Sequence, residues 1–147
     1  SGLRIDWSRP SASGAIDVQR FHRDHDDWRF LKRFVYLTDV TLRSGPHQYV
    51  DRSHTESGKL RARLYSLEDI AATDGSERVV SVVGPAGTSF IADTWGVHRG
   101  CPPVVGARLM LQIQYSLGPV RSFGYPKPLP GTLADFDRYT YRLLLAD

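Results

Sequence analysis

Short stretches rich in Val, Ile, Tyr, Phe and Thr alternate along the chain with clusters of glycine and proline. Within several stretches apolar and polar positions alternate, which is the pattern of a β-strand with one buried face. Turn-forming sequences at Ser44-Gly45-Pro46 and Gly84-Pro85-Ala86-Gly87 separate neighbouring stretches. This mainly β pattern favours an all-β jelly roll or barrel. It predicts strands at residues 17–24, 31–39, 47–50, 60–65, 78–83, 88–93 and 107–116.

Two further segments are predicted to be helical. Ser66 is a good N-terminal cap for a short helix through Ile70 and Ala71. Residues 132–144 carry a stripe of aromatic and leucine side chains, which predicts a C-terminal helix packed on the sheet.

The composition fits one compact domain spanning residues 1–147. Of the 147 residues, 41% are hydrophobic and 24% are charged, which provides enough apolar material for a single packed core. No apolar run approaches the roughly 18 residues that a membrane-spanning helix needs. We therefore expect a soluble domain with no membrane partner.

Charge and cysteine content narrow the expected partners and location. The net charge of +3 comes from basic residues spread along the chain, without the basic run of a nucleic-acid-binding arm. The single cysteine, Cys101, cannot form a disulfide within the chain. A reducing, cytoplasmic location is therefore the expected one.

The densest polar cluster of the chain is His22-Arg23-Asp24-His25-Asp26-Asp27, at the end of a predicted strand. Side chains two residues apart in a strand project from the same face, so His22 and Asp24 can approach one metal ion together. The same spacing relates His25 and Asp27. Spacing alone therefore leaves two registers open for a histidine–carboxylate pair.

A further ligand is available at His98, in the segment Asp93–Gly100. Two histidines and one carboxylate on a β scaffold can form the facial triad of non-haem Fe(II) oxygenases, which leaves positions open for a cosubstrate and O₂. Arg108 can lie on the adjacent strand, where its planar guanidinium would pair with a dicarboxylic acid. His47, which has no carboxylate two residues away, and His54 are interpreted as loop or structural residues.

Five segments, in order over roughly residues 20–117, resemble the phytanoyl-CoA dioxygenase family of Fe(II)- and 2-oxoglutarate-dependent oxygenases. They are FHRD with DDW, FVYLTDV, SGPHQYVDRSH, GPAGTSFIADTWGVHRGCPP and ARLMLQIQYS. The resemblance implies a double-stranded β-helix with His22, Asp24 and His98 as ligands of Fe(II). It also implies that Arg108 binds the distal carboxylate of 2-oxoglutarate. The resemblance thereby selects the register of His22 and Asp24.

Strand parity and the resemblance add four candidate residues. Lys32 and Phe34 share one face of the predicted strand 31–39. The family places an aromatic ring at the position of Phe34 against 2-oxoglutarate, and Lys32 is a second candidate cation for this cosubstrate. Trp28 matches an aromatic residue that some relatives place beside the substrate, and Asp27 is a neighbour of the site.

The resemblance implies an enzyme that hydroxylates a small or medium-sized organic substrate with O₂ and 2-oxoglutarate, giving succinate and CO₂ as co-products. Asp24 argues against halogenation, because halogenating relatives carry a small residue in place of this carboxylate. Two alternatives share the architecture. A cupin-type metal-dependent epimerase or lyase has no need of Arg108 as a cosubstrate partner, and a non-catalytic jelly-roll binding module would release no succinate.

The face of strand 107–116 opposite Arg108 is apolar, with Leu109, Leu111, Ile113 and Tyr115. An apolar sheet face of this kind needs a cover. The C-terminal helix can supply part of it. Relatives also carry N-terminal helical material there, which the residues before His22 do not provide. We therefore expect either a longer natural protein or a homo-oligomer.

Overall fold

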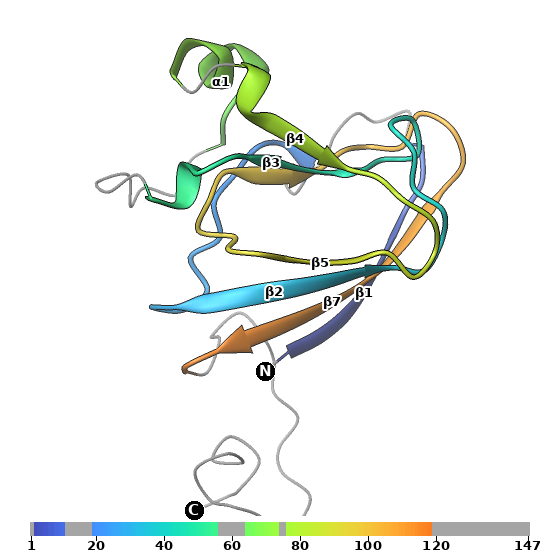
Figure 1. Cartoon of the computed structure of the whole chain (residues 1–147), viewed down its shortest axis with the longest axis horizontal. Coiled ribbons are helices and arrows are strands. Elements are labelled where there is room, and N and C mark those ends of the chain that lie inside the picture. The colour runs from blue at the N-terminus through green and yellow to red at the C-terminus, as the bar shows by residue number, and fades with distance from the viewer. Residues whose placement is uncertain (1, 11–18, 56–63, 74–75, 119–147) are drawn as a thin grey trace, which may run out of the picture.

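The computed structural model describes residues 2–10, 19–55, 64–73 and 76–118 of the chain. Its strands form two antiparallel sheets that face each other as the two layers of a sandwich (Figure 1). The larger sheet has the strand order β1-β7-β2-β5 and the smaller one β4-β3-β6. The strands are β1 (Gly2–Ser8), β2 (Phe30–Tyr36), β3 (His47–Val50), β4 (Val79–Val82), β5 (Ser89–Ala92), β6 (His98–Gly100) and β7 (Arg108–Ser116).

The mainly β, jelly-roll class predicted from the sequence is confirmed. Five of the predicted strands correspond to β2, β3, β4, β5 and β7. β2 ends at Tyr36, three residues before the predicted end at Asp39. The carboxylate of Asp39 instead accepts a hydrogen bond from the backbone N–H of Ala86 in the turn before β5 (2.8 Å).

Two predicted strands are reduced to isolated bridges in the described residues. In the segment 17–24, Phe21 pairs with Tyr65, and His22 pairs with His98. Tyr65 is likewise the one paired residue in the described part of the segment 60–65. Residues 17–18 and 60–63 of these two predicted strands lie outside the described residues. So does the predicted C-terminal helix at 132–144.

β1 and β6 are the strands that the sequence pattern did not predict. β1 pairs with β7 in antiparallel register, with Leu3 opposite Ile113 and Trp7 opposite Leu109. Its apolar residues point outward with those partners, whereas Arg4, Asp6 and Ser8 line the cavity between the sheets. The alternation of a strand is therefore present in β1, but its polar side faces inward.

Two apolar clusters hold the sandwich together. One lies between the sheets and contains Phe34, Tyr36, Val40 and Met110. The hydroxyl of Tyr36 on β2 donates to Val82 O (2.8 Å) and accepts from His47 N (3.0 Å), so it links the larger sheet to the smaller one. The other cluster lies under the helix α1 and contains Phe21, Val50, Tyr65, Ile70 and Val97.

The helix α1 (Leu67–Thr73) confirms the predicted cap at Ser66. Ser66 Oγ accepts a hydrogen bond from Asp69 N (3.0 Å), and Asp69 Oδ2 accepts one from Ser66 N (2.9 Å). These reciprocal bonds satisfy two donors of the first turn. None of the helices in the described part of the chain is long and apolar enough to cross a membrane.

The outer face of the larger sheet exposes an apolar surface, which we expect to bind a hydrophobic dye such as anilinonaphthalene sulfonate. Ile5 on β1 is 61% exposed and pairs with Leu111 on β7. Ile5→Lys should lower the dye fluorescence, because it places a charge on that surface. Leu42→Lys is the matched control, since Leu42 is 72% exposed but lies in a loop. Equal dye binding by both variants and the wild type would show that this face is covered.

Candidate functional site

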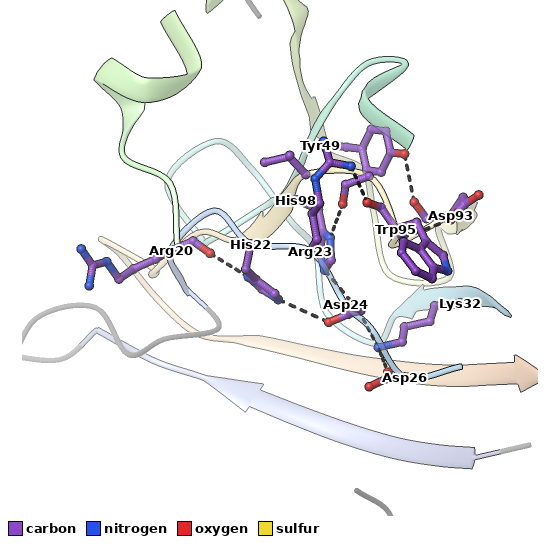
Figure 2. A network of polar contacts seen from close by, with 12 residues as sticks. Arg20, His22, Arg23, Asp24, Asp26, Lys32, Tyr49, Asp93, Trp95 and His98 are labelled. Carbon is purple, nitrogen blue, oxygen red and sulfur yellow. Dashed lines mark hydrogen bonds and ion pairs between the residues drawn. The ribbon is translucent and has the colours of Figure 1, made fainter. Parts of the chain in front are cut away.

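Three side chains that could bind a metal ion meet between the sheets, and they are called the metal-type cluster below. His22, Asp24 and His98 place one potential ligand atom each within 4.8 Å of one another. The His22 Nε2 atom lies 3.6 Å from Asp24 Oδ1, and the His98 Nε2 atom lies 3.4 Å from Asp24 Oδ2 (Figure 2). In the described part of the chain, no other group of three His, Cys, Asp or Glu residues meets this distance criterion.

Backbone pairing positions these three side chains. His22 and His98 exchange both backbone hydrogen bonds of an antiparallel bridge, each at 2.9 Å. Asp24 N donates to Thr94 O at 2.9 Å. This bond attaches the backbone at Asp24 to the loop before β6. The segment 21–24 therefore lies beside β6 as an additional edge of the smaller sheet, and its alternation directs His22 and Asp24 to the same side.

Backbone carbonyls orient both imidazole rings. His22 Nδ1 lies 2.8 Å from Arg20 O, and His98 Nδ1 lies 2.9 Å from Gly96 O. Because a carbonyl oxygen can only accept, each Nδ1 carries a proton, and Nε2 is the nitrogen of each ring that is left for a metal ion. Both Nε2 atoms face Asp24, so the carbonyls orient the rings as a metal site requires.

The three groups also adjust one another's ionisation. Burial by itself raises the pKa of Asp24, but hydrogen bonds from His22 and His98 outweigh it and hold that pKa well below its usual range. Burial lowers the pKa of His22, but the hydrogen bond to Asp24 and the Arg20 carbonyl outweigh it and raise the pKa overall. A carboxylate that stays ionised beside two imidazoles is the charge arrangement that a divalent cation binds.

Arg108 lies buried at the start of β7. Its Nη1 donates to Gly45 O, and its Nη2 donates to Ser8 Oγ (3.2 Å). Its buried Nε has no hydrogen-bond partner among the described residues. Gly100 gives the guanidinium room, because a Cβ at that position would lie 2.9 Å from Nη2. The guanidinium therefore has an unused donor in a buried place that a bulkier residue 100 would partly fill.

One cavity of about 170 Å³ joins the metal-type cluster to Arg108. All four side chains line it, and the inner faces of β1, β2 and β7 supply most of the remaining wall. Phe34 is buried in that wall and stacks on Phe90, with ring centroids 5.1 Å apart. The strand parity that predicted Lys32, Phe34 and Arg108 on inner faces is thus observed.

Lys32 lines this cavity, but its ammonium group is bound by carboxylates. Its Nζ donates to Asp24 Oδ2 at 2.6 Å and lies 2.9 Å from Asp26 Oδ2. Only 7% of the side chain is exposed. Sequence parity placed Lys32 on the correct face, but it could not show that Asp24 and Asp26 fold back onto its amino group.

Trp28 and Asp27 lie away from the cavity of the metal-type cluster. Trp28 is 84% exposed and borders a separate groove of about 680 Å³ whose walls include Phe30, Trp95 and Tyr115. Asp27 is occupied by backbone groups, because its carboxylate accepts from Trp28 N (2.7 Å) and Gly118 N (2.6 Å). Asp27 therefore fastens the segment before β2 to the end of β7.

The other histidines lie outside the cluster. His25 is exposed and packs edge-on against Trp95, with ring centroids 5.3 Å apart, so the register of His25 with Asp27 brings no metal-type cluster together in the described residues. His54 is exposed, with Nδ1 3.2 Å from Tyr49 Oη.

His47 is the residue whose position the sequence analysis missed. It is buried, lines the cavity of the cluster, and stacks on His98 with ring centroids 5.5 Å apart. Burial lowers its pKa well below the usual value, and the charges of His98 and Arg108 add to that effect. Its Nε2 has no hydrogen-bond partner among the described residues. The available signal was its place at the start of the predicted strand 47–50.

The comparisons with known proteins bear on the fold. No family model matches the chain, and no curated protein sequence matches it either. Among solved structures, the chain is similar to the non-heme alpha ketoglutarate dependent carbocyclase SnoK from nogalamycin biosynthesis, with 20% identity, a TM-score of 0.57, and coverage of 77% of this chain and 47% of that chain. The likeness shows the fold.

Two further solved structures agree. The non-heme monooxygenase ThoJ matches with 20% identity and a TM-score of 0.56, over 76% of this chain and 44% of that chain. EctD from S. alaskensis with bound Fe matches with 18% identity and a TM-score of 0.53, over 76% of this chain and 42% of that chain. This chain spans less than half the length of each of the three proteins.

The residues of the cavity fit Fe(II) together with a dicarboxylic 2-oxo acid. Two imidazole nitrogens and one carboxylate are the donor set that leaves room for further ligands on a divalent iron. In the same cavity, the unpaired Nε of Arg108 is suited to an anion, since burying a cationic donor without a partner is unfavourable. A metal ion bound by the cluster and a carboxylate bound by Arg108 would satisfy both groups.

Proposed function

We propose that this chain carries the active site of a non-haem Fe(II)- and 2-oxoglutarate-dependent oxygenase that hydroxylates a small or medium-sized organic substrate. The observation that carries the proposal is the joint placement, in one cavity, of the His22–Asp24–His98 cluster and a buried arginine with an unused donor. The order of motifs along the chain favours the phytanoyl-CoA dioxygenase branch of this class.

Each residue has a stated part in this proposal. His22, Asp24 and His98 hold the iron, which when bound supplies the activation of O₂. Arg108 binds the distal carboxylate of 2-oxoglutarate by a charge-assisted hydrogen bond. Phe34 excludes water from the cosubstrate's carbon chain, since its ring is buried in the cavity wall.

The groove beside Trp28 is separate from the cavity of the cluster, and it is proposed to hold a part of the substrate remote from the carbon that reacts. Its aromatic wall suits an apolar part of an organic molecule. Asp27 would act there indirectly, by fixing the backbone that carries Trp28. Arg108 favours an oxygenase over a metal-dependent epimerase or lyase, because those reactions need no partner for a second carboxylate.

Release of succinate from 2-oxoglutarate tests the proposal. The wild-type protein is incubated with Fe(II), 2-oxoglutarate and O₂, with and without a panel of metabolites. We expect Fe(II)-dependent succinate formation that one class of metabolite stimulates, and none from His98→Ala. A wild type that forms no succinate with any metabolite would favour a non-catalytic binding module.

Gly100→Ala is expected to weaken 2-oxoglutarate binding and leave metal binding unchanged. The Cβ of an alanine at position 100 would lie 2.9 Å from Arg108 Nη2. The guanidinium would therefore have to move. The far end of a flexible side chain moves more easily than backbone, so the fold should persist. Gly118→Ala is the control, because its Cβ would meet no atom closer than 3.4 Å. Equal cosubstrate affinity in both variants, measured by calorimetric titration, would argue against this placement of the carboxylate.

A further inference from the structure

Lys32 is a buried cation held between two carboxylates at the edge of the metal-type cluster. It projects from the inner face of β2, and Figure 2 shows its side chain reaching toward Asp24 and Asp26. Its Nζ lies 2.6 Å from Asp24 Oδ2 and 2.9 Å from Asp26 Oδ2. The ammonium also lies 5.6 Å from the centre of the Phe30 ring, which closes off another side.

The contact with Lys32 makes the two oxygens of Asp24 different. Oδ2 accepts the short hydrogen bond from Nζ and also lies 3.4 Å from His98 Nε2, whereas Oδ1 faces His22 Nε2 at 3.6 Å and has no hydrogen bond with Nζ in the described structure. A carboxylate that binds a metal through one oxygen is normally held through the other, and that hold fixes the direction of the free lone pairs. The Lys32 ammonium is in the position to provide it.

Asp26 removes the electrostatic cost of a cation at this place. An unbalanced ammonium beside Asp24 would neutralise the carboxylate and repel a divalent ion. With Asp26 in contact, the group of Asp24, Lys32 and Asp26 keeps one net negative charge. The structure thus combines a fixed Asp24 with a site that still attracts a cation.

We propose that Lys32 is a positioning residue that holds Asp24 in its metal-binding orientation, with Asp26 as its counter-charge. This role rests on the proposed function, because it presumes that Asp24 is a metal ligand. It differs from the role that the sequence suggested for Lys32, which was contact with the cosubstrate.

The central test is the double variant Lys32→Met/Asp26→Asn, which removes one charge of each sign and therefore keeps the net charge of the group. Mn(II) and Co(II) affinities are measured by titration without cosubstrate, and the visible spectrum of the Co(II) protein reports the ligand geometry. We expect the metal affinity to fall by about 10- to 100-fold, which is the usual effect of losing a partner that orients a ligand, and the Co(II) spectrum to change. Arg33→Met is the matched control, because Arg33 is the next cation on β2 but points outward and bonds Ser89 Oγ (2.9 Å).

Two single variants separate orientation from charge. Asp26→Asn alone should weaken metal binding, because the Lys32 charge then lacks its counter-charge. This substitution changes the shape of the side chain very little, so it keeps the test valid if the double variant does not fold. Lys32→Arg should restore most of the Co(II) spectrum that Lys32→Met alters, since it retains a donor to Asp24.

The outcomes distinguish this role from the proposed function. Wild-type metal affinity and an unchanged Co(II) spectrum in the double variant would overturn the positioning role. So would a loss confined to 2-oxoglutarate affinity, which would make Lys32 a cosubstrate contact. A wild type whose metal binding does not depend on His98 would instead refute the proposed function, and the role of Lys32 with it.

Discussion

Asp24→Ala is expected to abolish metal binding and turnover while the fold persists. The substitution removes one of the three side chains that are proposed to hold the iron, and the carboxylate it deletes lies between the other two. Lys32, which loses one partner, keeps its contact with Asp26 at 2.9 Å, so no buried charge is left alone. Metal titration by calorimetry measures the effect, and circular dichroism checks the fold.

His25→Ala is the control for this prediction. His25 is one residue away along the chain, but it is exposed and packs against Trp95 rather than the cluster. The variant should keep most of the metal affinity. The reverse ranking of the two variants would mean that His25 and Asp27, the other register allowed by the spacing, form the site.

Arg108→Met should raise the requirement for 2-oxoglutarate far more than it changes the affinity for metal. Removing one member of a buried, charge-assisted pair costs roughly 2–5 kcal/mol, which is about 30-fold to several thousand-fold in affinity. Arg108→Lys should recover only part of this loss, because an ammonium group cannot reproduce the planar guanidinium. Calorimetric titration of the metal-loaded proteins with 2-oxoglutarate gives the ratio of the wild-type and variant affinities.

The matched control for Arg108 is Arg33→Met, which removes a cation from the outer face of the same sheet. It should leave both affinities unchanged. If Arg108→Met behaves like this control, the distal carboxylate binds elsewhere in the cavity, where Lys32 and Arg4 are the other cationic side chains of the described wall.

The sequence predicted the strands that form long alternating runs rich in β-branched and aromatic residues. β2 and β7 are of this kind, and strand parity put Phe34 with Lys32, and Met110 with Arg108, on the faces that the structure shows to be the inner ones. β1 (GLRIDWS) alternates in the same sense as β7, but it has only one β-branched residue, Ile5, and so gave a weaker strand signal. β6 has only three residues, too few for any period to be visible.

The candidate site was predictable in its residue types but not in its contacts. Period-two spacing put His22 and Asp24 on one side, but it allowed His25 and Asp27 equally, and only the family resemblance chose between them. The pairing of Lys32 with Asp24 and Asp26 depends on how the segment after the motif turns back toward β2, which no local pattern encodes. The burial of His47 against His98 depends on the register between β3 and β6, where His47 lies opposite Gly100.

The most direct test of the proposed site is an anaerobic titration of the Fe(II)-loaded protein with 2-oxoglutarate, followed by visible absorption. Chelation of Fe(II) by a 2-oxo acid gives a charge-transfer band, so the signal requires the metal and the cosubstrate to be bound together and needs no substrate. The proposed site predicts a saturable band in the wild type, its absence in Asp24→Ala, and its shift to much higher 2-oxoglutarate concentration in Arg108→Met. A wild type with no such band, or a band that survives Asp24→Ala unchanged, would contradict the assignment of His22, Asp24, His98 and Arg108 to one Fe(II) and 2-oxoglutarate site.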